Sequence, residues 1–171
     1  MQIEIEHCSC CGAKLTGRYE RISKGLALSL LKFREKVLHE SELSNTLVNK
    51  VHLSKDLNLS KNEYNNFQKL RYHGLIAHYK DKITKEYETG YWLLTKRGNL
   101  FCKNELAVPK KLLIFRNKIE ERSEEKIILR DILTEDNLPH WYQKEDYNMS
   151  FEDTNDFDEN SQNDNQLDLF D

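Results

Sequence analysis

The sequence predicts an α+β fold in which a body of helices and short strands is followed by a disordered acidic tail. Two stretches of the body indicate this. Residues 24–40 have the apolar spacing of a buried helix, and residues 56–101 give a turn, a helix, a two-stranded hairpin and a second helix in one run. The third observation is compositional, because residues 145–171 contain ten carboxylates and neither Lys nor Arg.

The central helix is expected to begin near Ser60, because Ser60 and Glu63 have the spacing of a capping box, in which each side chain binds a free amide of the first turn. It should end near His73, where Gly74 allows the left-handed conformation that often closes a helix. Apolar residues three positions apart would form its buried side. These residues are Tyr64, Phe67 and Leu70.

The opposite face of this helix is rich in amides and lysines and has no carboxylate apart from Glu63. It contains Asn62, Asn65, Asn66, Lys69 and His73, and Lys61 flanks it. Asn can pair with the N6 and N7 edge of adenine and Lys can neutralise phosphates, so this face suits DNA. The whole chain is rich in Asn and Lys, and composition alone is the alternative explanation.

The chain changes to a strand pattern after Gly74. Residues 75–79 and 91–94 are rich in aliphatic and aromatic side chains, and they flank a charged loop over residues 80–90. Thr95 should cap a further helix that extends to about Phe101, and Gly98 within it would permit close packing.

This order resembles the winged helix-turn-helix family, in which a polar recognition helix precedes a basic hairpin loop, the wing, and a closing strand. The resemblance covers about half of the chain and includes Gly-Leu-Ile at 74–76 and Trp-Leu-Leu-Thr at 92–95 followed by Gly98. It implies that the major groove is contacted by Lys61, Asn62, Asn65, Asn66 and Lys69. It also implies that phosphates or a minor groove are contacted by Lys80, Lys82 and Lys85. Winged helices also serve as protein-interaction modules, which is the alternative.

The segments before this stretch complete the predicted domain. The helix over residues 24–40 has Ser23 as its cap. Residues 41–49 are polar and predict a loop, with a short helix as the alternative. Residues 51–53 would be a short third strand, residues 54–57 a brief helix, and residues 15–22 a connector.

Pro109 marks a boundary, beyond which the sequence predicts a long hairpin. Residues 111–119 and 126–132 have a strand pattern, and the glutamate-rich residues 120–125 would be the tip, although helices fit the same periodicity. The aromatic residues at 138–142 would fold back onto the body. The predicted organisation is a Cys-rich knuckle at 1–22, a winged-helix domain at 23–106, a β-hairpin extension at 107–144 and a disordered tail at 145–171.

The cysteines predict half of a metal site. Cys8 and Cys11 have the spacing of a zinc knuckle, in which two thiolates three residues apart bind one metal from a tight turn. Completing a zinc site would require His7, Cys10, Cys102, a distant His or a second chain. A knuckle without metal is the alternative, and Cys102 is expected to be a buried apolar residue. Zinc is the one cofactor that the sequence suggests.

The tail is too polar to offset the entropy of ordering, and it ends in a short apolar motif. This motif, Gln166-Leu167-Asp168-Leu169-Phe170, resembles the bacterial sliding-clamp-binding motif at all five positions. The resemblance implies that Gln166 bonds at the rim of the clamp's pocket while Leu169 and Phe170 fill its hydrophobic cleft. A micromolar-scale interaction of about −8 kcal/mol is expected. The alternatives are a chance match and an acidic tail that recruits replication proteins through an aromatic residue.

The distribution of charge and the absence of catalytic motifs limit the classes of function that the sequence predicts. All 26 basic residues lie within residues 1–144 beside 19 of the 29 acidic ones, so the body favours polyanions. No phosphate-binding loop, zinc-protease motif or nucleophile elbow is present, so an enzyme is not predicted. No apolar run reaches the roughly 20 residues that span a bilayer and no signal peptide follows Met1, so we expect a cytoplasmic protein.

The leading hypothesis is a DNA-binding accessory protein of bacterial, plasmid or phage replication or repair, tethered by its tail to the sliding clamp. A winged-helix transcriptional regulator is the first alternative. An inhibitor that occupies the clamp cleft is the second. The sequence leaves the oligomeric state open.

Overall fold

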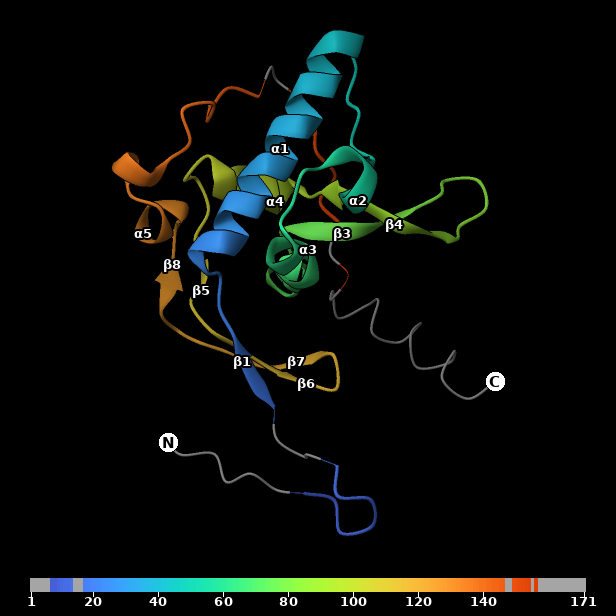
Figure 1. Ribbon diagram of the computed structural model, residues 1–171, viewed down its shortest axis with the longest axis vertical. Coiled ribbons are helices and arrows are strands. Elements are labelled where there is room, and N and C mark those ends of the chain that lie inside the picture. Colours follow the sequence, from blue (N-terminus) through green and yellow to red (C-terminus); the bar gives the residue numbers. More distant parts are fainter. Residues whose placement is uncertain (1–6, 14–16, 147–148, 155, 157–171) are drawn as a thin grey trace.

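The computed structural model describes residues 7–13, 17–146, 149–154 and 156, and it has the predicted α+β composition (Figure 1). Its elements are β1 (Arg18–Glu20), α1 (Lys24–Ser44), β2 (Val51–His52), α2 (Leu53–Asp56), α3 (Lys61–Phe67), the 3-10 helix η1 (Gln68–His73), β3 (Ile76–Lys80), β4 (Tyr87–Leu94), α4 (Lys96–Cys102), β5 (Val108–Pro109), β6 (Leu112–Phe115), β7 (Lys118–Arg122), β8 (Lys126–Ile127), α5 (Leu129–Ile132) and the 3-10 helix η2 (Glu135–Asn137). No helix in this part of the chain has the length and apolar character that crossing a bilayer requires.

The described strands form three small antiparallel sheets. The first has the order β2-β4-β3, with Val51 opposite Trp92 and Ile76 opposite Leu94. The second has the order β1-β6-β7, and β5 pairs with β8 in the third. In Figure 1 the β6–β7 hairpin lies below α1, and the β3–β4 hairpin projects to the right.

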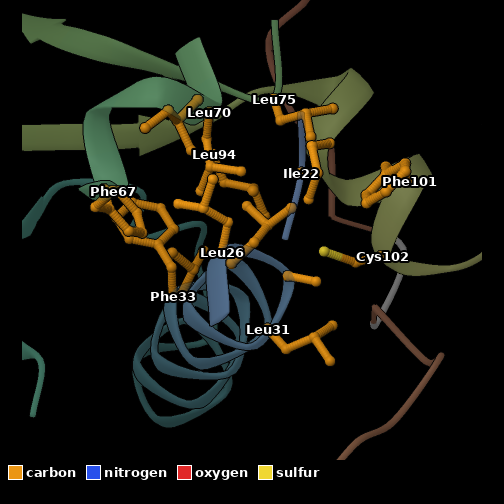
Figure 2. Close-up of a cluster of buried hydrophobic side chains, with 14 of the residues drawn as sticks. Ile22, Leu26, Leu31, Phe33, Phe67, Leu70, Leu75, Leu94, Phe101 and Cys102 are labelled. Atoms are coloured by element: carbon orange, nitrogen blue, oxygen red, sulfur yellow. The ribbon is translucent and has the colours of Figure 1, made fainter. Parts of the chain in front are cut away.

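The main core lies between α1, the first sheet and α4 (Figure 2). Phe33 of α1 packs against Phe67 of α3 with ring centroids 5.3 Å apart, and Phe67 lies edge-on to Trp92 of β4 at 6.4 Å. Leu70 and Leu94 are fully buried in the same cluster. Because burying one large apolar side chain contributes about 1.5–3 kcal/mol, this cluster fixes α3 and the hairpin against α1.

Helix α1 extends beyond its predicted end at Glu40 to residue 44. The first residues of the predicted loop at 41–49 therefore belong to the helix. Ser41 is buried, and its hydroxyl accepts a hydrogen bond from the Val48 amide at 2.8 Å. Asn45 then ends the helix in a left-handed conformation with φ 53°. A polar segment can continue a helix when its hydroxyl has a buried partner of this kind.

The predicted central helix is divided into α3 and η1. It begins at the capping box, where Ser60 Oγ accepts from the Glu63 amide at 3.2 Å and Glu63 Oε2 accepts from the Ser60 amide at 2.8 Å. Gly74 ends η1 with φ 73°, as the sequence predicts. Phe67 is buried, but Tyr64 is 47% exposed, so its predicted place in the core is wrong. Tyr64 lies one turn before the contact that Phe67 makes with α1.

The predicted hairpin of β3 and β4 has a shorter loop than expected. β4 begins at Tyr87, so the loop spans residues 81–86 rather than 80–90. Asp81 Oδ1 accepts hydrogen bonds from the amides of Ile83 and Thr84, both at 2.8 Å. These two bonds lower the pKa of Asp81, and the ionised carboxylate keeps the loop folded back on itself.

Helix α4 confirms the expected roles of Thr95 and Gly98. Thr95 Oγ1 accepts a hydrogen bond from the Gly98 amide at 2.9 Å and donates one to the Gly74 carbonyl at 2.6 Å. A Cβ atom at Gly98 would lie 2.0 Å from the Leu75 carbonyl oxygen. Only glycine therefore allows α4 to pack directly on the start of β3.

The predicted hairpin over residues 111–132 is wrong in the position of its turn. β6 and β7 reverse direction at Arg116 and Asn117, which have φ values of 48° and 61°. Residues 120–122 therefore lie in β7, and residues 126–132 divide between β8 and α5. Asn tolerates the left-handed conformation better than most residues, so Asn117 allows this tight turn, and the first glutamates of residues 120–125 are part of β7 instead of a tip.

Residues 18–20, predicted to be part of a connector, form β1 on the edge of the second sheet. Glu20 lies opposite Leu112 of β6 and is 6% exposed. Its carboxylate is paired with Arg18 Nε at 2.6 Å and with Lys69 Nζ at 3.5 Å. A strand of three residues is too short to show a period, so no pattern in the sequence predicts it.

The described residues between Glu145 and Asp156 contact the body, although the sequence predicts disorder from Glu145 onward. Phe151 is buried in the main core, and the Glu152 carbonyl accepts a hydrogen bond from the first amide of α4 at 2.8 Å. Asp156 Oδ2 accepts from the His78 amide at 3.2 Å and lies 2.9 Å from His78 Nδ1. One aromatic anchor therefore holds a segment whose average composition is too polar to predict order.

The aromatic residues at 138–142 fold back onto the body as predicted. Trp141 and Tyr142 pack against the main core. The Tyr142 hydroxyl donates a hydrogen bond to the Cys102 carbonyl at 2.6 Å. Cys102 is itself fully buried, as expected, and burial raises the pKa of its thiol to about 12.

Candidate nucleic-acid interface and thiol cluster

Helix α3 presents most of the residues that the sequence selects for DNA contact. Lys61, Asn62 and Asn65 are exposed, and Asn66 is half-buried. The side-chain Nδ2 of Asn66 donates to the backbone carbonyl of Asn62 at 2.8 Å and to Asn62 Oδ1 at 3.0 Å, so these two side chains hold each other in place. Within the described residues the Asn65 side chain has no hydrogen bond, which leaves its amide available to a base edge.

The carboxylate nearest this face is neutralised. Lys32 Nζ lies 3.1 Å from both oxygens of Glu63. Partial burial acts to raise the pKa of Glu63, but the hydrogen bond from the Ser60 amide and the charge of Lys32 outweigh it and lower the pKa. The start of α3 therefore presents no uncompensated negative charge to a polyanion.

Lys69 is placed apart from the other predicted contacts. It belongs to η1, and its Nζ lies 3.5 Å from Glu20 Oε2 in β1. This lysine therefore compensates a buried carboxylate of the second sheet. Spacing along one helix groups Lys69 with Asn62 and Asn65, but the change to a 3-10 helix after Phe67 alters the direction of the later side chains.

The loop of residues 81–86 presents two of the three predicted wing lysines, Lys82 and Lys85, and both are exposed. Lys80, at the end of β3, has its Nζ 5.4 Å from the centroid of the Tyr87 ring. Ile83 is 91% exposed beside them and was not selected from the sequence. A large apolar side chain between lysines suits a surface that meets both the charged and the apolar parts of a nucleic-acid groove.

Two acidic residues of the C-terminal segment, Glu152 and Asp156, lie against this hairpin. Glu152 Oε1 lies 3.5 Å from Lys82 Nζ, and Asp156 bonds to His78. His78 is stacked on Trp92 with ring centroids 4.0 Å apart. No sequence pattern predicts that His78 joins the hairpin to the C-terminal segment, because its partner Asp156 lies 78 residues further along the chain.

The thiols of Cys8, Cys10 and Cys11 form a cluster in which all three Sγ atoms lie within 4.8 Å of one another. A tight turn holds it: the Cys8 amide donates to the Ala13 carbonyl at 2.7 Å, and the Gly12 amide donates to the Cys8 carbonyl at 2.9 Å. The structure thus adds Cys10 to the predicted pair. Cys102 is buried in the core and does not belong to the cluster.

The donor set fits a thiophilic ion such as Zn²⁺. Zinc–sulfur bonds of about 2.3 Å separate neighbouring tetrahedral sulfurs by about 3.8 Å, close to the spread of this cluster. Cys8 and Cys10 Sγ lie 2.8 Å apart and would have to separate by about 1 Å to bind the same ion. Hydrogen bonds from the Cys10 thiol and then from the Cys10 and Cys11 amides lower the pKa of Cys8 to about 6, so a thiolate is present at neutral pH.

Zinc is expected to protect these three thiols, but not Cys102, from alkylation. The full chain would be treated with an alkylating reagent with and without zinc, and the modified cysteines would be identified by mass spectrometry. Protection of Cys8, Cys10 and Cys11 that weakens below about pH 6 is expected, because protons compete with the metal for thiolates. Cys102→Ala is the control and should keep the protection. Equal labelling with and without zinc would exclude a metal-binding role.

The proposed clamp-binding residues Gln166 to Phe170 lie outside the described residues. In the described parts of the chain, the predicted site residues form three separate groups. These are the residues of α3, the predicted wing lysines of the β3–β4 hairpin, and the thiol cluster. No protein-family model, curated protein or solved structure matches the chain.

Proposed function

We propose that residues 23–106 form a winged helix-turn-helix domain that binds duplex DNA. The observation that carries this proposal is the path of the chain. A long helix, a short edge strand, two helices and a hairpin follow one another, and the sheet order β2-β4-β3 places the edge strand beside the last strand. In this arrangement α3 is the recognition helix and residues 81–86 are the wing.

The chemistry of the two surfaces supports the proposal. Exposed amides on α3 can pair with base edges, and the neighbouring lysine can neutralise a phosphate. Lys82 and Lys85 on the wing are exposed cations at a second position along the duplex. Contacts to phosphates would supply most of the affinity, because each one releases condensed counterions.

The C-terminal segment gives this domain an internal competitor. Glu152 contacts wing residue Lys82, so a carboxylate occupies part of the surface that we assign to phosphate contact. The exposed pair is weak, and a duplex that offers several phosphates would displace it. The acidic segment therefore favours specific or multiple contacts over weak ones.

We further propose that the domain serves a clamp-bound accessory role in replication or repair. Support comes from the match of residues 166–170 to the sliding-clamp-binding motif. A clamp that encircles DNA and a domain that holds the same DNA would strengthen each other by raising the effective concentration. A transcriptional regulator is the second candidate. The proposed winged-helix domain supports it equally, and it does not require residues 166–170 to bind a clamp.

Titration of duplex DNA against the full chain tests the DNA-binding proposal. We expect affinity to fall steeply with salt, because lysines make the contacts. A test variant replaces three exposed lysines of α3 and the wing by Gln: Lys61, Lys82 and Lys85. A matched control replaces three exposed lysines elsewhere: Lys111, Lys118 and Lys144.

The plot of log affinity against log salt concentration has a negative slope. Its absolute value should decrease by about three in the test variant and stay unchanged in the control. This comparison removes the same charge in both proteins, so it separates a defined surface from general attraction. An affinity that does not depend on salt, or an equal loss in both variants, would refute DNA binding by α3 and the wing. The inhibitor alternative would then gain support.

A further inference from the structure

A cavity of about 380 Å³ lies at the seam between the main body and the second sheet. We call it the seam pocket. Residues of η1 and α4 line one side, and residues of β5 through β8 line the other. None of its lining residues belongs to α3 or to loop 81–86, so it is distinct from the surface that we assign to DNA. Its volume is within the range of small-molecule sites.

The charge that lines the seam pocket is entirely positive. Arg97, Arg122 and Lys126 line it, and none of the described lining residues is a carboxylate. Within the described part of the chain, no salt bridge joins any of these three cations to an acidic residue. Three cations that share one cavity repel one another, and an anion between them would remove that repulsion. Arginine side chains match the paired oxygens of a phosphate.

A buried polar atom on the same wall lacks a partner. His73 is 5% exposed, and its Nδ1 is buried without a hydrogen bond within the described residues. Burial, and then the charge of Arg97, lower the pKa of His73 to about 4, so the ring is neutral at neutral pH. The His73 side chain therefore adds no charge to the three cations that line the pocket.

The remaining lining is apolar or weakly polar. Leu106, Pro109 and Leu112 contribute aliphatic surface, Tyr72 contributes a ring, and Ser123 contributes a hydroxyl. Inorganic phosphate alone would leave this apolar part of the cavity unfilled. A ligand with a charged head and a flat or apolar body would use both parts.

We propose that the seam pocket binds a small phosphate monoester with a ring-containing body, of the size of a nucleoside monophosphate. Its phosphate contacts Arg97, Arg122 and Lys126. Its body covers the aliphatic wall. Such a ligand joins η1 and α4 to the second sheet, and it therefore stabilises the contact between them.

The test uses the full chain, labelled with ¹⁵N, and follows amide and His73 imidazole signals by NMR. The probes are adenosine 5′-monophosphate, adenosine and inorganic phosphate. The variant Arg122→Gln/Lys126→Gln removes two cations of the pocket. The matched control Arg116→Gln/Lys118→Gln removes two exposed cations at the turn of the same hairpin, which do not line the pocket.

The monophosphate should shift His73, Ser123 and Arg97 signals and bind at least tenfold more weakly to the pocket variant, with no change in the control. Adenosine should bind far more weakly than the monophosphate, and inorganic phosphate should shift the same residues at higher concentration. Equal binding of adenosine and its monophosphate, shifts confined to α3 and loop 81–86, or no binding would each overturn the proposal.

A fourth probe separates two sources of the same chemistry. An oligonucleotide with a 5′-phosphate is compared with the same oligonucleotide that ends in a hydroxyl. If only the phosphorylated form shifts His73, the pocket accepts a terminal phosphate of DNA. If neither form shifts it while the monophosphate does, the ligand is a free nucleotide. Both outcomes support recognition of a phosphate monoester.

Discussion

Replacing Gly98 by Ala is expected to lower the free energy of unfolding by about 3 kcal/mol. The added Cβ would lie 2.0 Å from the Leu75 carbonyl oxygen and 2.8 Å from Leu94 Cδ1. The first of these atoms is backbone, so α4 or the start of β3 would have to move. Equilibrium unfolding in urea, with the slope compared between variants, measures the change.

Gly25→Ala is the matched control for this substitution. Gly25 also lies in a helix, but its added Cβ would meet nothing closer than Ser23 Oγ at 3.8 Å. Its stability should stay the same or rise slightly, because Ala loses less backbone entropy than Gly. Similar losses at both positions would show that the contact of α4 with β3 is not as close as the structure gives.

Arg34→Met is expected to lower the free energy of unfolding by about 3 kcal/mol or more. Arg34 is 2% exposed, and its Nε donates to Asn99 Oδ1 at 2.8 Å. Its other nitrogens donate to the carbonyls of Gln143, Lys144 and Glu145. A methionine would fill similar space but leave these acceptors without a donor, so the C-terminal segment should loosen.

Limited proteolysis and hydrogen exchange of residues 143–156 would show that loosening directly. Arg130→Met is the control, because this arginine is exposed and its ion pair with Glu135 is 3.9 Å long. Its effect should stay within about 0.5 kcal/mol. If Arg34→Met lowers stability while exchange in residues 143–156 stays unchanged, the arginine would act through α1 and α4 alone.

The parts of the fold that the sequence predicts correctly depend on local signals. The capping box at Ser60, the left-handed Gly74, the Thr95 cap and the close packing at Gly98 each follow from a few neighbouring residues. Such features depend on backbone geometry that one residue type satisfies best, so they can be inferred without knowing the tertiary fold.

The incorrect predictions depend on contacts between distant segments. β1 pairs with the distant strand β6, and the carboxylate of Glu20 pairs with Lys69 of η1. The end of α1 depends on the buried Ser41, whose hydroxyl accepts from the Val48 amide. The segment after residue 144 is held by Phe151 and by donors on α1 and α4. None of these partners is adjacent in the sequence, so local patterns and average composition do not predict these contacts.

The residues of the candidate sites also fall into those that local spacing predicts and those that only the fold brings together. Helical spacing identified the exposed residues of α3, and the Cys-x-x-Cys spacing identified two of three clustered thiols. Helical spacing wrongly grouped Lys69 with the exposed residues of α3, because the helix changes from α to 3-10 after Phe67. The seam pocket and the contact of His78 with Asp156 need the folded arrangement, because their residues come from separate elements.

We propose that a DNA-binding body and a clamp-binding motif act together in one chain. The most direct test titrates a bacterial sliding clamp against the full chain, a version ending at Asn165, and the variant Leu169→Ala/Phe170→Ala, which keeps every carboxylate of the tail. We predict a micromolar-scale dissociation constant for the full chain that becomes smaller on primed DNA. We predict no measurable binding by the other two proteins. Equal affinity of all three proteins, or no binding by any of them, would contradict the claim and favour a transcriptional regulator.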